Sequence, residues 1–255
     1  MIDTRAAVAK FRSLESLAVI PRVSSTNLVA RRIVDECVAN DLSLPHAMII
    51  AGEQFAGRGR YDRRWSSPAG KGIYATMLLT RSTRALPLVP LEMANVVASF
   101  LRDVFSIDAR VKWPNDVLAG GRKIAGILTE ARIQDDRAYV IVGTGINVEP
   151  AENDDRPNAV AMREVSPRDF RGVDEATAAF VEHVDERLSR PIERECVLAE
   201  WRGLTVHAPG DRITCVVAGS SFVGTWSGLD DEGRALLRRG EEIVPVSAGE
   251  FILGA

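Results

Sequence analysis

Residues 120–147 read GGRKIAGILTEARIQDDRAYVIVGTGIN, and this stretch decides the fold that the sequence predicts. Two β-rich runs, 123–133 and 137–147, lie on either side of a polar turn at 134–136. Runs of this kind, separated by turn residues, predict antiparallel strands joined by hairpins. With a further strand expected at 108–113, they predict an antiparallel meander.

The elements around this meander predict an α+β chain. Apolar residues at helical spacing predict helices at 4–17, 28–38, 87–106 and from 169 to about 202. Apolar, β-rich runs predict further strands at 18–23, 46–52 and 72–80.

The character of the chain changes after Gly203. Short β segments alternate with glycine and aspartate turns, at 212–217, 221–228, 235–239 and 242–246. This pattern predicts a small β-barrel. We therefore expect two domains, residues 1–205 and residues 206–255.

Composition limits the classes of function. The 255 residues are 46% hydrophobic and 26% charged, as in ordinary soluble proteins, and the net charge of −3 argues against general nucleic-acid binding. No apolar run approaches the length of about 20 residues that spans a bilayer, and the N-terminus opens no signal peptide. The three cysteines lie far apart and lack metal-site spacing. We expect a cytoplasmic protein with no membrane partner.

The segment Gly57–Trp65, GRGRYDRRW, is the most distinctive candidate site. It carries four guanidinium groups within seven residues, interleaved with glycine. These charges repel one another, so the segment should become ordered when an anion supplies the opposite charge. Trp65 adds a flat apolar face on which a ring could stack. The alternative is an exposed, solvated basic loop.

A second candidate is the run Lys112-Trp113-Pro114-Asn115-Asp116. Pro114 lacks an amide hydrogen and ends the strand, which places Asn115 and Asp116 in a turn. Lys112 lies in an otherwise apolar strand end, where a buried ammonium requires an anion. An ion pair between Lys112 and Asp116, with no further role, is the structural alternative.

Two further segments carry candidate residues. Only four of the 32 basic residues are lysines, so lysine at positions 112 and 123 indicates a need for a compact ammonium. Strand alternation places Lys123 on the face of Ala125 and Ile127, opposite Gly126. Ser24–Asn27 offers small hydrogen-bonding side chains, or simply a helix N-cap. No P-loop, dinucleotide fingerprint or nucleophile–base pair is present in these segments.

Together these motifs resemble the biotin protein ligases over nearly the whole chain. The resemblance is carried by Ser25-Thr26-Asn27, Gln54, Gly57-Arg58-Gly59-Arg60, Trp65, Lys112-Trp113-Pro114-Asn115-Asp116, Arg122-Lys123-Ile124-Ala125-Gly126-Ile127-Leu128 and Gly143-Thr144-Gly145-Ile146-Asn147. It implies a mixed β-sheet with flanking helices, related to class II aminoacyl-tRNA synthetases, and a small SH3-like barrel. That fold agrees with the one expected from periodicity.

The resemblance also implies an ATP-dependent reaction in two steps. The carboxylate of biotin attacks the α-phosphate of ATP, giving biotinyl-5′-AMP and pyrophosphate. A lysine of a biotin carboxyl carrier domain of a carboxylase then attacks the anhydride and releases AMP. Mg²⁺ and basic side chains would offset the repulsion between carboxylate and polyphosphate. Only 24 residues precede Ser25, so we expect a monofunctional ligase without the DNA-binding domain of the repressor members.

Residue roles follow from the same resemblance. Biotin-binding roles fall on Ser25, Thr26, Asn27, Gln54, Arg58, Gly59, Arg60, Lys123 and Gly126. Nucleotide-binding roles fall on Arg60, Arg63, Trp65, Lys112, Asn115 and Asn147. Catalytic roles fall on Lys123, Arg60, Lys112 and Asp116, and Asp116 would orient either magnesium or the incoming lysine. The family often has glycine where this chain has Asp62, a difference that would lower the flexibility of the loop or weaken its positive field.

Three other functions are alternatives. A lipoate–protein ligase runs the same adenylation chemistry, but the presence of both the GRGR and KWPND motifs favours biotin. A nucleic-acid-binding module using the Arg/Gly segment would bind with strong salt dependence, and the acidic chain disfavours it. An inactive scaffold is disfavoured by the intact lysines and Asn/Asp residues.

Overall fold

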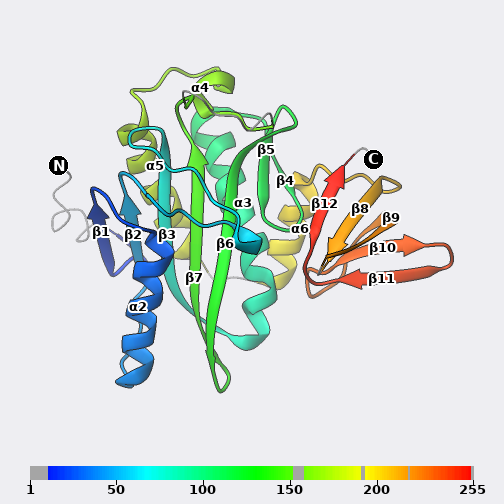
Figure 1. The fold of residues 1–255 in the computed structure, drawn as a ribbon, viewed down its shortest axis with the longest axis horizontal. Coiled ribbons are helices and arrows are strands. Elements are labelled where there is room, and N and C mark those ends of the chain that lie inside the picture. Colours follow the sequence, from blue (N-terminus) through cyan, green and yellow to red (C-terminus); the bar gives the residue numbers. More distant parts are fainter. Residues whose placement is uncertain (1–10, 152–157, 191–192, 218, 254–255) are drawn as a thin grey trace.

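A mixed β-sheet dominates the computed structural model, which describes residues 11–151, 158–190, 193–217 and 219–253 (Figure 1). Its strand order is β1-β2-β3-β7-β6-β5-β4. The strands are β1 (Ser16–Ile20), β2 (Ala47–Ala51), β3 (Gly72–Ser82), β4 (Ala109–Lys112), β5 (Asp116–Ala119), β6 (Arg122–Gln134) and β7 (Arg137–Asn147). β1 and β2 run parallel, and the other neighbouring strands are antiparallel. The β6–β7 hairpin predicted from residues 120–147 is therefore confirmed.

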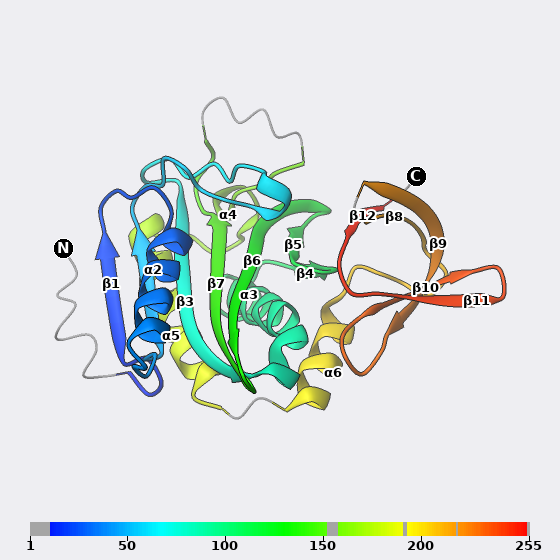
Figure 2. The same cartoon turned by 60° about the horizontal axis from the view of Figure 1, so that its bottom comes forward.

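Helices cover both faces of this sheet (Figure 2). One face packs against α2 (Thr26–Ala39), and the other against α3 (Val89–Phe105) and α5 (Val173–Leu188). α6 (Arg194–Leu204) packs against α3. The period of two in the strands explains this division: in β3, Met77 faces the core under α3, whereas Leu78 faces the core under α2. Shorter helical turns are η1 (Arg60–Asp62), η2 (Thr83–Leu88) and α4 (Met162–Val165).

A second, antiparallel sheet follows α6. Its order is β11-β10-β9-β8-β12. The strands are β8 (Arg212–Val217), β9 (Ser220–Leu229), β10 (Ala235–Arg239), β11 (Glu242–Val246) and β12 (Glu250–Leu253). The four strands predicted after Gly203 are confirmed, and β12 was missed.

The structure corrects several element predictions. The helix expected at 4–17 is wrong for the residues described, because the chain bends from residue 11 and enters β1 at Ser16; residues 1–10 lie outside the described part. The long helix expected to about residue 202 is two helices, α5 and α6. β5 was missed, and Asp116 opens that strand instead of lying in the turn.

In the part of the chain that the structure describes, one helical stretch is long and apolar enough to cross a membrane. It is Thr83–Phe105, with a mean hydropathy of 1.2 in its most apolar window, of which 67% is buried. The prediction that no apolar run approaches this length was therefore too strong. Buried core helices pass the same test, so the stretch is weak evidence for a membrane span.

An aromatic cluster joins the two sheets. The rings of Trp113, after β4, and Phe251, in β12, lie 4.6 Å apart between centroids. His207 packs on Trp226 at 4.7 Å, and its Nε2 accepts a hydrogen bond from the backbone N–H of Trp113 at 3.1 Å. Because these side chains belong to the core under α3, one hydrophobic core runs through both sheets.

His207 should make stability depend on pH. Burial, assisted by the charge of Lys112, lowers its pKa from 6.5 to about 4. The unfolded chain therefore binds a proton at higher pH than the folded chain. This contribution to stability is complete above pH 6.5 and falls by about 3 kcal/mol as the pH drops from 6.5 to 4.

We expect His207→Gln to flatten this dependence, because an amide oxygen can still accept the Trp113 N–H and does not titrate. Denaturant unfolding at about pH 5 and about pH 7.5 measures the difference. An equal loss of stability in variant and parent would assign the effect to other groups.

Candidate active site

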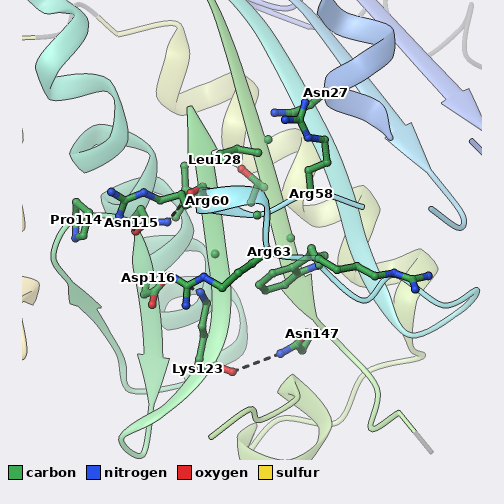
Figure 3. A pocket seen from close by; sticks show the side chains of 18 of the residues that line it. Asn27, Arg58, Arg60, Arg63, Pro114, Asn115, Asp116, Lys123, Leu128 and Asn147 are labelled. Atoms are coloured by element: carbon green, nitrogen blue, oxygen red, sulfur yellow. Dashed lines mark hydrogen bonds and ion pairs between the residues drawn. The ribbon is translucent and has the colours of Figure 1, made fainter. Parts of the chain in front are cut away.

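A cavity of about 490 Å³ opens on the α2 side of the seven-stranded sheet. Its wall is built from the start of α2, the loop at 54–65, the β4–β5 turn, β6, β7 and the start of β12 (Figure 3). All the residues to which the sequence assigned a role lie in this wall: Ser25, Thr26, Asn27, Gln54, Arg58, Gly59, Arg60, Arg63, Trp65, Lys112, Asn115, Asp116, Lys123, Gly126 and Asn147. Segments more than 100 residues apart thus meet in one place.

One end of the cavity is neutral and rich in hydrogen bonds. The backbone N–H of Thr26 donates to Gln54 Oε1 at 2.8 Å, and the hydroxyl oxygen of Thr26 lies 3.1 Å from the same atom. The amide of Gln54 in turn donates to Ser67 Oγ at 3.0 Å. Ser25 takes the N-cap position of α2 with an extended backbone, as the structural alternative expects, but it makes no side-chain cap bond. These buried polar groups face the cavity instead.

Glycines in β6 and β7 form the floor beneath this end. A Cβ on Gly143 would collide with the side chain of Asn27, and one on Gly145 with the indole of Trp65. A Cβ on Gly126 would lie 3.0 Å from the same indole. The sequence motif contained these glycines, but their role as space for Asn27 and Trp65 was not predicted.

A β-bulge overturns the face expected for Lys123. Opposite Val117 and Leu118 of β5, the partners in β6 step from Ala125 to Lys123. The extra residue shifts the alternation, as bulges do. Lys123 therefore extends over Gly126, where an added Cβ would lie 3.2 Å from its Nζ, and the same Nζ lies 5.4 Å from the centroid of Trp65. Ala125 and Ile127 point into the core instead.

The opposite end of the cavity is charged. Lys123 Nζ donates to Asp116 Oδ1 at 2.5 Å, so in the described chain Asp116 pairs with Lys123 and not, as expected, with Lys112. Burial lowers the pKa of Lys112, and the carboxylate of Asp116 opposes that shift. Asn147 Nδ2 donates to the carbonyls of Val160 and Lys123, at 3.2 and 3.4 Å. The amide of Asn147 therefore ties the backbones that border this end.

Two arginines of the Arg/Gly loop bind acceptors within the chain itself. Arg63 forms two hydrogen bonds to Glu250, each 2.9 Å long. Arg60 donates to Asn115 Oδ1 at 2.9 Å and to the carbonyl of Gly249 at 3.0 Å. These contacts give the loop acceptors within the chain, and its ordering by an external anion stays a prediction. The side chain of Asp62 lies outside the described part of the structure.

The C-terminal sheet thus contributes residues that the sequence did not assign. Gly249 and Glu250 precede and open β12, and Phe251 also lies in the cavity wall. The hydrogen bond to Arg63 lowers the pKa of Glu250, which keeps that carboxylate ionised. Missing β12 hid this contact, because four residues after a glycine turn give little strand signal.

The described residues contain no group of three or more His, Cys, Asp or Glu side chains placed to hold a metal ion. The acids in the cavity wall, Asp116 and Glu250, are both ion-paired to basic side chains. None of the three histidines lies in the wall. The donor set therefore does not fit a resident metal, and nothing in the chain's own geometry assigns Asp116 to one.

The chain also matches the models of two known protein families. Residues 19–147 match the model of the Biotin/lipoate A/B protein ligase family, and residues 210–254 match the Biotin protein ligase C terminal domain. The chain belongs to this family. With both parts matched, it is a biotin ligase enzyme.

Relatives of the ligase cover most of its length. The biotin–[acetyl-CoA-carboxylase] ligase of Paracoccus denitrificans is 30% identical, over 92% of this chain and 99% of its own. The Bacillus subtilis bifunctional ligase/repressor BirA is 29% identical, over 91% of this chain and 72% of its own. A solved structure, biotin protein ligase from Aquifex aeolicus in complex with biotin and ATP, is 25% identical, covers 93% of this chain and 98% of its own, and has a TM-score of 0.71.

The glycine floor of the ligase should be intolerant of a single methyl group. We expect Gly145→Ala to displace the indole of Trp65, because the new Cβ would overlap the ring. Intrinsic fluorescence should shift as Trp65 leaves its half-buried position, and ligase activity should fall by about 10-fold or more. Gly203→Ala is the control, since a Cβ there meets nothing within 4 Å. Parental activity in Gly145→Ala would contradict the assigned packing.

Proposed function

We propose that this ligase attaches biotin to a lysine of the biotin carboxyl carrier domain of a carboxylase, using ATP and forming biotinyl-5′-AMP. The observation that carries the proposal is the difference in polarity between the two ends of this cavity. Its neutral end suits the ureido ring of biotin, which both donates and accepts hydrogen bonds. Its cationic end suits a carboxylate next to phosphates, since like charges must be neutralised before they react.

The neutral end takes the biotin ring in this proposal. Thr26, Asn27 and Gln54 are buried or half-buried and already fixed by hydrogen bonds, so little entropy is lost on binding. The remaining proposed biotin contacts are Ser25, Arg58, Gly59, Arg60, Lys123 and Gly126. The lack of a side chain on Gly126 leaves room for Trp65 and Lys123, beside which the valeryl chain would lie.

The cationic end takes the reacting groups. An oxygen of the biotin carboxylate attacks the α-phosphorus, the bond to the bridging oxygen of pyrophosphate breaks, and the electron pair leaves with pyrophosphate. Lys123 stabilises the charge that develops at the α-phosphate, and Lys112 and Arg60 assist. Arg63, Trp65, Asn115 and Asn147 serve the nucleotide. An uncharged lysine of the carrier then attacks the acyl carbon, and AMP leaves.

Magnesium is part of the proposal only through ATP. Mg²⁺ commonly keeps several waters and binds substrate phosphates with one or two carboxylates, and when bound it neutralises phosphate charge. Asp116 keeps the two roles that the resemblance implies, toward the Mg²⁺ bound to ATP or toward the incoming lysine, and in either role its carboxylate would be shared with Lys123. The protein itself supplies positioning and cationic side chains.

We also propose the finer description of the fold. The division into residues 1–205 and 206–255, an SH3-like barrel for the second part and a kinship of the first with class II aminoacyl-tRNA synthetases are consistent with the two sheets and their order. The operation of the chain as a ligase alone, without DNA binding, is likewise a proposal.

Purified protein tested with ATP, Mg²⁺ and either biotin or lipoate decides between the ligase functions. We expect pyrophosphate exchange and a mass shift on a biotin carboxyl carrier domain with biotin alone. Exchange with lipoate but not biotin would establish the lipoate ligase alternative.

Lys123→Ala should lower biotin-dependent pyrophosphate exchange by about 100-fold or more, because it removes the ammonium nearest the reacting groups and leaves Asp116 unpaired. Arg122→Ala is the matched control. Arg122 lies next in the strand but pairs with Glu164, outside the cavity. Near-parental exchange in Lys123→Ala would reject the catalytic role.

Arg60→Gly should release the intermediate early, because Arg60 ties the loop to Asn115 and to the Gly249 carbonyl. The measurement is biotin labelling of lysines on a bystander protein, which should rise relative to labelling of the carrier domain. Arg64→Gly controls for added backbone freedom, since Arg64 donates only within the loop region, to Phe55. Equal bystander labelling by the two variants would contradict the anchoring role.

A further inference from the structure

Glu130 connects three elements behind the neutral end of the cavity. It lies on β6, outside the cavity wall, with 22% of its side chain exposed. Its Oε2 accepts a hydrogen bond from Asn27 Nδ2 at 3.0 Å, and its Oε1 accepts one from Arg31 of α2. The guanidinium of Arg58 lies 3.8 Å from the same Oε1. The carboxylate therefore touches the cavity only through its partners.

Asn27 is held at both ends of its amide. Its Nδ2 donates to Glu130, and its Oδ1 accepts from the hydroxyl of Thr76 at 2.7 Å. An ionised carboxylate has no hydrogen to donate. Glu130 thus fixes which end of the Asn27 amide faces β3.

The direction set at Glu130 passes along a chain of hydroxyls. The single hydroxyl proton of Thr76 goes to Asn27 Oδ1, so Thr76 Oγ1 is left as an acceptor for the hydroxyl of Thr26, 2.7 Å away. Gln54 Oε1 remains held by the Thr26 backbone N–H. The lone pairs of Thr26 then face the cavity, ready to accept a hydrogen bond from a ligand N–H.

We propose that Glu130 is a positioning residue that sets the direction of the hydrogen bonds at the neutral end of the cavity and thereby its preference for a ring bearing N–H donors. The inference rests on the proposed function, because it takes the ring with N–H donors to be the ureido ring of biotin. Lipoate has a dithiolane ring with no N–H group, so it gains nothing from this direction. Glu130 thus discriminates between the two vitamins without touching either.

Arg31 makes the substitution Glu130→Gln informative. Because a guanidinium only donates, the new amide must keep its oxygen toward Arg31 and turn its NH₂ toward Asn27. Asn27 must then flip, and the hydroxyl chain reverses. In Glu130→Gln/Arg31→Ala the nearer guanidinium is gone and Arg58 lies 3.8 Å away, so the amide can turn more easily. Its oxygen can then accept from Asn27 again, and binding should recover in part.

The experiment measures biotin and ATP affinities separately, by calorimetry on the full chain, together with KM and kcat. We expect Glu130→Gln to weaken biotin binding by about 10-fold or more, with ATP affinity and kcat near parental values. Asp35→Asn is the matched control, because Asp35 pairs with Arg132 across the same α2–β6 contact without reaching the cavity. It should bind biotin as the parent does.

Each outcome has a separate meaning. Failure of the parent chain to bind biotin would overturn the proposed function. Biotin binding by the parent with unchanged affinity in Glu130→Gln would overturn only the role of Glu130. An equal loss of biotin and ATP binding would show a general structural role and also reject the proposal. If Glu130→Gln does not fold, Thr76→Val breaks the same chain one bond further on and should give the same selective loss.

Discussion

Close approach to the α2 face of β6 and β7 is the constraint on which the site depends. Gly126, Gly143 and Gly145 place no side chains on this patch, and the space is taken by Asn27 and Trp65. A side chain at any of these positions would lift the start of α2 or the Arg/Gly loop away from the sheet. The cavity exists because the sheet carries no side chains where the start of α2 and the Arg/Gly loop pack against it.

Three of the cations around this bare surface lie next to carboxylates of the chain itself. Lys123 pairs with Asp116, Arg63 with Glu250, and Arg58 lies near Glu130. An anion that binds here therefore competes with carboxylates that already lie next to these three basic side chains. This competition lowers the net affinity for any one anion, but the internal contacts hold the loop and its basic side chains in position. A chain of net charge −3 can hold a local cationic site in this way.

The sequence could predict features that depend on residues close together along the chain, and not those that depend on distant residues. The β6–β7 hairpin, α2 and α3 depend on periodicity over neighbouring residues, and the sequence predicted them. The side on which Lys123 lies depends on a bulge opposite β5, which periodicity within one strand cannot show. The contact between Arg63 and Glu250 joins residues 187 positions apart. The motifs indicated which residues lie together in the cavity wall, whereas the ion-pair partner of each residue could be identified only in the folded chain.

The C-terminal sheet is part of the site as well as part of the core. Phe251 packs on Trp113, which follows β4, and the neighbouring Glu250 reaches the loop over the cavity. Because Trp113 is followed by Asn115 and Asp116, the same aromatic contact that buries Phe251 also fixes the turn that holds these polar groups. The geometry of the charged end of the cavity thus depends on the packing between the two sheets. A change that loosens the aromatic cluster would disturb the charged residues before it unfolded either sheet.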